Sequence, residues 1–191
     1  SDSKEEIIEE RVALKTEIKN NAQQESTTEK SEQLMESLFE ALTQADNMKT
    51  TAQSLREAAL TVSANEKTIL INEAISLEKE YIAKRVEISN LKSALTYDKF
   101  NLNRLVINEL MSKVKDNVAI ADYVNLLNQE AERLMKIGKE MREEANAQLT
   151  YSAKYGSMSN AEETEYTAIS KQIESIQFIE KNNSLIVIAS R

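Results

Sequence analysis

One apolar stripe with a seven-residue period occurs twice in this chain, and it limits the possible folds more than any other feature. The first stripe runs from Leu34 to Ala59, in steps of four and three residues: Leu34, Leu38, Ala41, Ala45, Met48, Ala52, Leu55 and Ala59. This spacing places all eight side chains on one face of an α-helix, and it is typical of helices that pack along their length. We call this face the seam.

Adding 86 to each number produces a second stripe in which every residue is again apolar or small: Ile120, Val124, Leu127, Ala131, Leu134, Gly138, Met141 and Ala145. The match continues beside the seam, because Leu55-Arg56-Glu57-Ala58-Ala59 corresponds to Met141-Arg142-Glu143-Glu144-Ala145. A core-facing pattern alone does not require Arg-Glu at the same phase in both stretches. The sequence therefore indicates an internal duplication.

The composition favours long helices over sheets. Proline is absent and glycine occurs only at positions 138 and 156, whereas tight β-hairpins need Gly, Asn-Gly or Pro in their turns. We predict an all-α fold of elongated antiparallel helical hairpins, or a bundle, in two helical units, 1–96 and 97–191. About six helices are expected, over residues 2–24, 27–60, 63–95, 97–114, 118–151 and 160–182.

Capping boxes suggest where these helices begin, because a Ser or Thr followed three residues later by Glu satisfies the first free amides. Such boxes start at Ser26, Ser63 and Ser159. The third one predicts a loop at 152–158 and about ten additional residues at the second hairpin tip. The last helix is expected to end near Asn182-Asn183 and to face inward with Tyr166, Ile169, Ile173, Ile176 and Ile179.

Two questions about the ends of the sequence stay open. Residues 1–24 either begin the first unit or belong to a preceding repeat. The apolar residues at 185–189 either pack back onto the helices or lead into a further domain, and packing back is favoured because an exposed apolar tail promotes aggregation.

Charge and residue types exclude several functions. The net charge is −8 and basic residues alternate with acidic ones, which disfavours a nucleic-acid partner, and no apolar run is long enough for membrane insertion. Without His or Cys, nucleophilic triads and the usual di-iron sites are impossible. Two groups of carboxylates are read as solvated helix faces: Glu5, Glu6, Glu9 and Glu10, and Glu140, Glu143 and Glu144. We predict no catalytic, cofactor-binding or metal site.

Two features are candidates for binding or close contact. Tyr151, Tyr155 and Tyr166, with Met158, lie near the second hairpin tip and form a candidate interaction surface, because tyrosine buries area while keeping a polar end. The alternative is that Tyr166 belongs to the core and the others close the tip. Gly138 replaces Ala52 of the first stripe, and we interpret it as a site of tight helix contact.

The stretches Ala45–Ala59 and Glu66–Ile82 carry a resemblance to a known family. Their pattern, Ala-x-x-Met-x-x-x-Ala-x-x-Leu-Arg-x-x-Ala followed by Glu-Lys-x-x-Leu-x-x-Glu-Ala-x-x-Leu-Glu-x-x-x-Ile, resembles the long helical-hairpin repeats of large Bacteroidetes envelope proteins. Those proteins also carry tetratricopeptide, PD40 or OmpA-like domains. The resemblance implies a periplasmic or envelope-associated scaffold without enzymatic activity, in secretion or gliding machinery, and it transfers no binding residues.

We therefore expect a non-enzymatic scaffold for protein partners, because helical repeats bury a continuous core and leave long faces exposed. Two alternatives stay open. One is a coiled-coil element that self-associates into homo-oligomers. The other is a ligand carrier that uses the tyrosine-lined hairpin tip.

Overall fold

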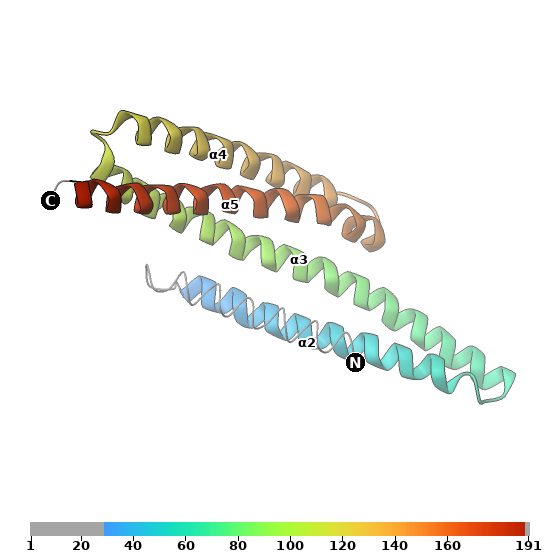
Figure 1. Cartoon of the computed structure of the whole chain (residues 1–191). Helices are drawn as coiled ribbons and strands as arrows, with labels where there is room; N and C mark the ends of the chain where they lie inside the picture. The colour runs from blue at the N-terminus through green and yellow to red at the C-terminus, as the bar shows by residue number, and fades with distance from the viewer. Residues whose placement is uncertain (1–28, 190–191) are drawn as a thin grey trace. The chain divides into compact units, whose positions relative to one another are not determined.

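The computed structural model describes residues 29–189, and their side chains from 29 to 183. This part of the chain contains no strand and consists of four α-helices (Figure 1): α2 (Glu29–Ala58), α3 (Ala64–Val114), α4 (Val118–Asn146) and α5 (Tyr151–Ala189). The all-α prediction is confirmed. The helix expected at 2–24 and the capping box at Ser26 lie outside the described residues.

Helix α3 replaces two of the six expected helices. It is continuous over 51 residues, so the separate connecting helix predicted at 97–114 is wrong. Leu95-Thr96-Tyr97 contains neither Gly nor Pro. A break there would release backbone N–H and C=O groups from their helical partners without anything to replace them. The apolar arc of residues 97–114 is therefore the end of a long helix.

The second hairpin turn also differs from the prediction. Helix α4 ends at Asn146 instead of Tyr151, and α5 begins at Tyr151 instead of residue 160, so the expected loop at 152–158 is helical. The cap is Thr150, whose Oγ1 accepts a hydrogen bond from the Ala153 N–H at 3.1 Å. Ser159 lies inside the helix. At its other end α5 continues past Asn182-Asn183 to Ala189, and no described non-Gly residue has a positive φ, so the left-handed cap is absent.

The two hairpin turns are nearly equal in length. Ser63 caps α3 at the predicted position, since the Glu66 N–H donates to Ser63 Oγ at 3.4 Å. The first turn covers residues 59–63 and the second covers 147–150. The ten additional residues predicted at the second tip do not exist. The return helices begin at residues 64 and 151, which are 87 apart, almost the 86 that separates the two seams.

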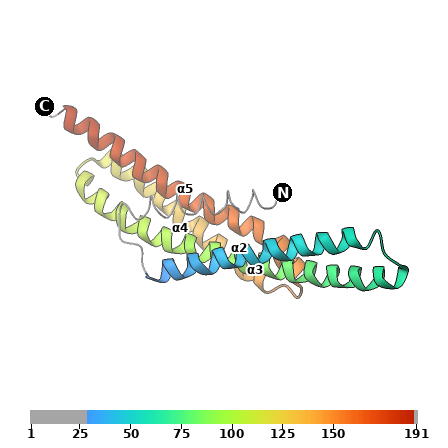
Figure 2. The same ribbon diagram turned by 90° about the horizontal axis from the view of Figure 1, so that it is seen from below.

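The chain forms two compact units, each built from two stretches of sequence. Among the described residues, the first comprises 29–92 and 145–156, and the second comprises 93–144 and 157–189. In the first unit α2 lies antiparallel beside the N-terminal half of α3 (Figure 2). The boundary predicted at 96/97 concerns sequence repeats, and these structural units do not test it.

The seam is confirmed in both copies. All sixteen seam residues are buried or half-buried, and Ala45 and Ala131, at corresponding positions, are each 1% exposed. Alanine at such positions lets neighbouring helices approach closely along their length. Burial of the apolar stripe from water is the main favourable contribution to the fold.

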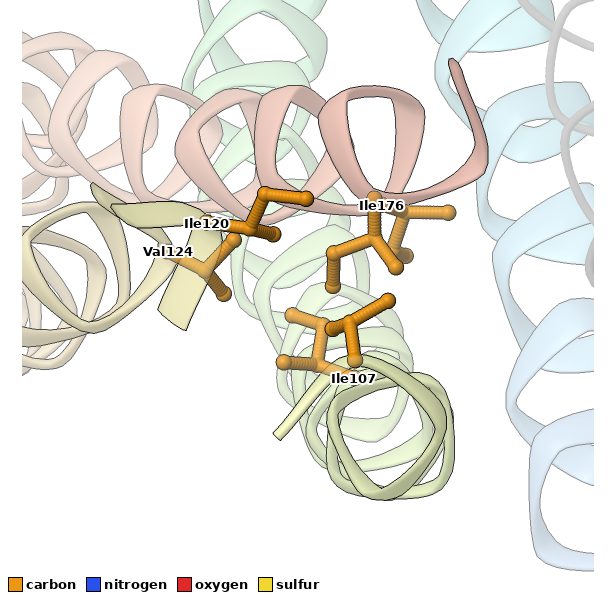
Figure 3. Close-up of a cluster of buried hydrophobic side chains, with 6 residues drawn as sticks. Ile107, Ile120, Val124 and Ile176 are labelled. Atoms are coloured by element: carbon orange, nitrogen blue, oxygen red, sulfur yellow. The ribbon is translucent and has the colours of Figure 1, made fainter. Parts of the chain in front are cut away.

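In the second unit the C-terminal half of α3 packs against α4 and α5. Figure 3 shows Ile107 of α3, Ile120 and Val124 of α4, and Ile176 of α5 directed toward one another. Another cluster brings Phe100 of α3 together with residues of α4 and α5: Ala131, Met135, Ala168 and Ile169. Each seven-residue repeat therefore adds another layer of three-helix packing.

The buried face of α5 differs from the predicted one. It is a heptad stripe of residues at most 2% exposed: Met158, Ala161, Glu165, Ala168, Gln172, Ser175 and Ile179. Ile169 and Ile176 are buried beside it, but Tyr166 and Ile173 are exposed, so their predicted inward orientation is wrong. Three of the seven stripe residues are polar. The apolar residues of α5 by themselves therefore indicate a face that is rotated away from the buried stripe.

Gly138 lies where α4 meets α5 most closely, as the sequence predicted. A Cβ built on Gly138 would be 2.9 Å from Glu165 Cγ and 3.4 Å from the Glu165 backbone nitrogen. The first distance is shorter than real Cβ contacts, and the second is at the lower limit of ordinary contact. An alanine would therefore require the Glu165 side chain, which Arg142 and Ser93 hold, to shift.

We predict opposite effects for alanine at the two glycines. Gly138→Ala should lower the free energy of unfolding, because overpacking costs about 1–3 kcal/mol. Gly156→Ala should raise it by about 1 kcal/mol, because alanine is the better helix former and nothing lies within 4 Å of its Cβ. Urea unfolding followed by circular dichroism measures both. Equal shifts of the same sign would contradict the close contact at Gly138.

Candidate functional site

A buried ion pair joins α4 to α5 in the second unit. The Arg142 side chain is 9% exposed and that of Glu165 is 3% exposed. Arg142 Nη2 donates to Glu165 Oε1 at 2.6 Å, and Nε lies 3.1 and 3.2 Å from the two carboxylate oxygens. The planar guanidinium therefore holds the carboxylate in a bidentate arrangement, which fixes the relative position of the two helices.

Helix α3 contributes two further polar side chains to this pair. Ser93 Oγ donates a hydrogen bond to Glu165 Oε2, so the carboxylate is bonded from both neighbouring helices. The Tyr97 hydroxyl is buried and has no hydrogen-bond partner among the described residues. We call Ser93, Tyr97, Arg142 and Glu165 the polar cluster.

Burial raises the pKa of Tyr97 to about 12, and the nearby charge of Glu165 adds to this effect. Arg142 acts in the opposite direction but is the weaker influence. The phenol therefore stays neutral over the physiological range, with an unsatisfied hydroxyl inside the helix packing. Such a group reduces stability, because a buried donor without a partner loses its hydrogen bonds to water.

The first copy contains the same pair at the corresponding positions. Arg56 is 86 residues before Arg142, and Glu78 is 87 residues before Glu165. Arg56 Nε and Nη2 donate to the two oxygens of Glu78 at 2.5 and 2.9 Å. Here the side chains are 46% and 44% exposed. The hydrogen bond from Arg56 lowers the pKa of Glu78, and the same bond raises the pKa of Arg56.

This repeated pair supports the duplication on the return helices as well, where the sequence predicts about ten additional residues in the second copy. With an offset of 87, Ala74 and Ala161 also correspond, and both are fully buried. The α5 stripe then matches a stripe of α3 that is buried or half-buried throughout: Ile71, Ala74, Glu78, Tyr81, Arg85, Ile88 and Lys92. The outgoing and return helices repeat together, with one added residue between them.

Other buried polar contacts extend along α5. Asn103 Nδ2 of α3 donates to Gln172 Oε1 at 3.2 Å, and Gln172 Nε2 donates to the Phe100 carbonyl at 3.0 Å. Ser175 Oγ lies 3.3 Å from Asn128 Oδ1 of α4. Each polar residue of the α5 stripe is therefore satisfied by a neighbouring helix. A helix shifted along its axis would lose these hydrogen bonds, so they favour a single register.

The residues of the predicted tyrosine surface differ in their exposure. Met158 is 1% exposed and belongs to the core, whereas Tyr166 is 69% exposed on the second unit. Tyr151 and Tyr155 are exposed in the first unit, together with Leu149, which is 100% exposed. We call Leu149, Tyr151 and Tyr155 the tip surface. Lys154 lies 5.2 Å from the Tyr151 ring centroid and Arg85 lies 6.0 Å from that of Tyr155, and both cations help to position the rings.

Within the part of the chain that the structure describes, no three acidic residues converge as a metal site would require, and Glu140, Glu143 and Glu144 point to solvent. Glu5, Glu6, Glu9 and Glu10 lie outside it. No described helix combines the length and apolar character needed to cross a membrane.

No protein-family model matches the sequence, and neither a curated protein nor a solved structure does. The resemblance to Bacteroidetes envelope repeats therefore stays a prediction.

We predict that the two corresponding glutamates differ in their contribution to stability. Glu165→Gln should lower the free energy of unfolding by about 3–5 kcal/mol, because it leaves the buried Arg142 without a counter-charge. Glu78→Gln should leave the urea midpoint nearly unchanged, because solvent screens the exposed pair. Similar losses in both variants would show that burial does not distinguish the two pairs.

A second prediction concerns alkaline pH. The pKa of Tyr97 is higher in the folded chain than in the unfolded chain, so its contribution to stability is complete below about pH 10 and is lost as pH rises toward 12. Tyr97→Phe should reduce this loss, as measured by urea unfolding at several pH values. Tyr166→Phe, a control at an exposed tyrosine, should leave the loss of stability at high pH unchanged. An unchanged profile in Tyr97→Phe would refute the assignment.

Proposed function

We propose that this chain is a non-enzymatic scaffold for protein–protein interaction, built from two copies of a long helical hairpin. Its place is in an envelope-associated assembly in the periplasm, such as secretion or gliding machinery, as the family resemblance implies. The tip surface carries this proposal, because a fully exposed leucine next to two exposed tyrosines is unusual unless a partner covers them.

The first hairpin tip adds support, since it also exposes apolar side chains. Leu60, Val62 and Ile69 lie at or next to the turn, and Leu60 is 78% exposed. Burying these residues within the hairpin would require a larger turn with more chain. Apolar side chains at both turns are consistent with a repeat that presents its tips to partners.

The absence of His and Cys from the sequence supports a non-enzymatic role, because it removes the commonest general base and the thiolate nucleophile. The buried polar residues also fit a structural role. Glu165 and Gln172 form hydrogen bonds with neighbouring helices, and these bonds fix the register of the helices.

Self-association is the second candidate. Val118 and Leu126 are exposed two turns apart on α4, and Leu105 is exposed on α3. Helices of two chains could cover such residues in a homo-oligomer. Light scattering during size-exclusion chromatography distinguishes the readings, because self-association gives a mass that rises with concentration and the scaffold reading gives one monomer mass.

We expect the tagged 191-residue chain to capture a defined protein from an envelope extract of the source organism. Replacing Leu149 and Tyr151 by serine should abolish capture, whereas Leu126→Ser, a change of another exposed leucine, should retain it. Circular dichroism checks that all three proteins are folded. Capture that survives in the tip variant, or no capture by the wild type, would contradict the proposal. A ligand carrier would instead reveal itself by thermal stabilisation with a small metabolite.

A further inference from the structure

The second copy is completed by the stretch of chain that precedes it. Residues 93–114 of α3 come directly before α4, and they pack on both α4 and α5. Ser93 bonds to Glu165, Phe100 contacts the cluster around Ala131, and Ile107 contacts Val124. Of these residues, Ser93 lies on the Arg142–Glu165 pair itself, and the other contacts hold the rest of residues 93–114 along α4 and α5.

The first copy has the same pair but no described segment that covers it in this way. The Arg56 and Glu78 side chains remain nearly half exposed, although they are hydrogen-bonded to each other as Arg142 and Glu165 are. Helix α2 is preceded by residues 2–24, just as α4 is preceded by residues 93–114. The stretches contain 23 and 22 residues, and short connections, 25–28 and 115–117, join them to α2 and α4.

The duplication specifies which residues would make the corresponding contacts. Subtracting 86 places Ile7 at the position of Ser93 and Leu14 at that of Phe100. Ile7, Leu14 and Ile18 are spaced to share one face of a helix. Arg11 corresponds to Tyr97 and Asn21 to Ile107, so among these positions Leu14, at the position of Phe100, is the apolar residue that the two stretches share.

We propose that residues 2–24 dock on α2 and on the N-terminal half of α3 as the third helix of the first copy, with Ile7 beside the Arg56–Glu78 pair. The segment that covers α2 and the N-terminal half of α3 in this proposal is thus the N-terminal part of the same chain. A helix of 23 residues is about 35 Å long, which is enough to follow most of α2. The proposal concerns an internal contact and does not depend on the proposed function.

Cysteine cross-linking tests this contact in the full chain, which contains no native cysteine. Ile7→Cys with Glu78→Cys should cross-link within one chain when treated with a short bifunctional thiol reagent. Glu9→Cys with Glu78→Cys is the control, because residue 9 lies about 200° around the helix from residue 7. The cysteines at positions 7 and 78 should cross-link several-fold more completely than those at positions 9 and 78.

Hydrogen exchange supplies a second, independent readout. Leu14→Asp should increase exchange in α2 and leave α4 unchanged, whereas Ala13→Asp introduces the same charge on another face and should have little effect. Equal cross-linking of the two cysteine pairs, or equal exchange in the two aspartate variants, would overturn the proposal. Cross-links found only between chains would overturn it as well, because the segment would then dock on a second copy.

Discussion

A buried charge pair between the outgoing helix α4 and the return helix α5 is the interaction on which the second copy of this repeat depends. The apolar seam brings the helices together but tolerates sliding, because an alanine or leucine finds similar neighbours one heptad further along. A bidentate Arg–Glu pair tolerates no such shift. Arg142 and Glu165 therefore set the register of the second hairpin, and Gly138 leaves the space that the Glu165 side chain occupies in this register.

The two pairs show how the same chemistry acts in different surroundings. Arg56–Glu78 is partly solvated, so water screens its attraction and its loss is tolerable. Arg142–Glu165 is enclosed, and its charges are costly unless every hydrogen bond is made. Ser93 supplies one of those bonds from a third helix. Such a pair adds little net stability compared with apolar packing, but it penalises every wrong alignment of the helices.

The sequence predicted the helical class, the seam and the position of Gly138, because these follow from apolar periodicity and from the scarcity of Gly and Pro. It did not predict the continuous α3, although residues 95–97 contain neither Gly nor Pro, because the wide apolar arc of residues 97–114 resembles that of a separate helix. The face of α5 was misread because Glu165, Gln172 and Ser175 occupy core positions. The capping pattern at Ser159 was misleading, because such patterns also occur by chance inside helices, and it concealed the 87-residue correspondence between Glu78 and Glu165.

A double-mutant cycle on Arg142 and Glu165 measures most directly whether this pair fixes the second hairpin. The free energies of unfolding of Arg142→Met, Glu165→Gln and the double variant separate the interaction from the individual losses. We expect a coupling of at least about 1.5 kcal/mol, in the range found for close, desolvated charge pairs, so that the double variant is far less destabilised than the two losses added together. Additive losses would mean that the two side chains act independently, and the pair would then have no role in setting the register.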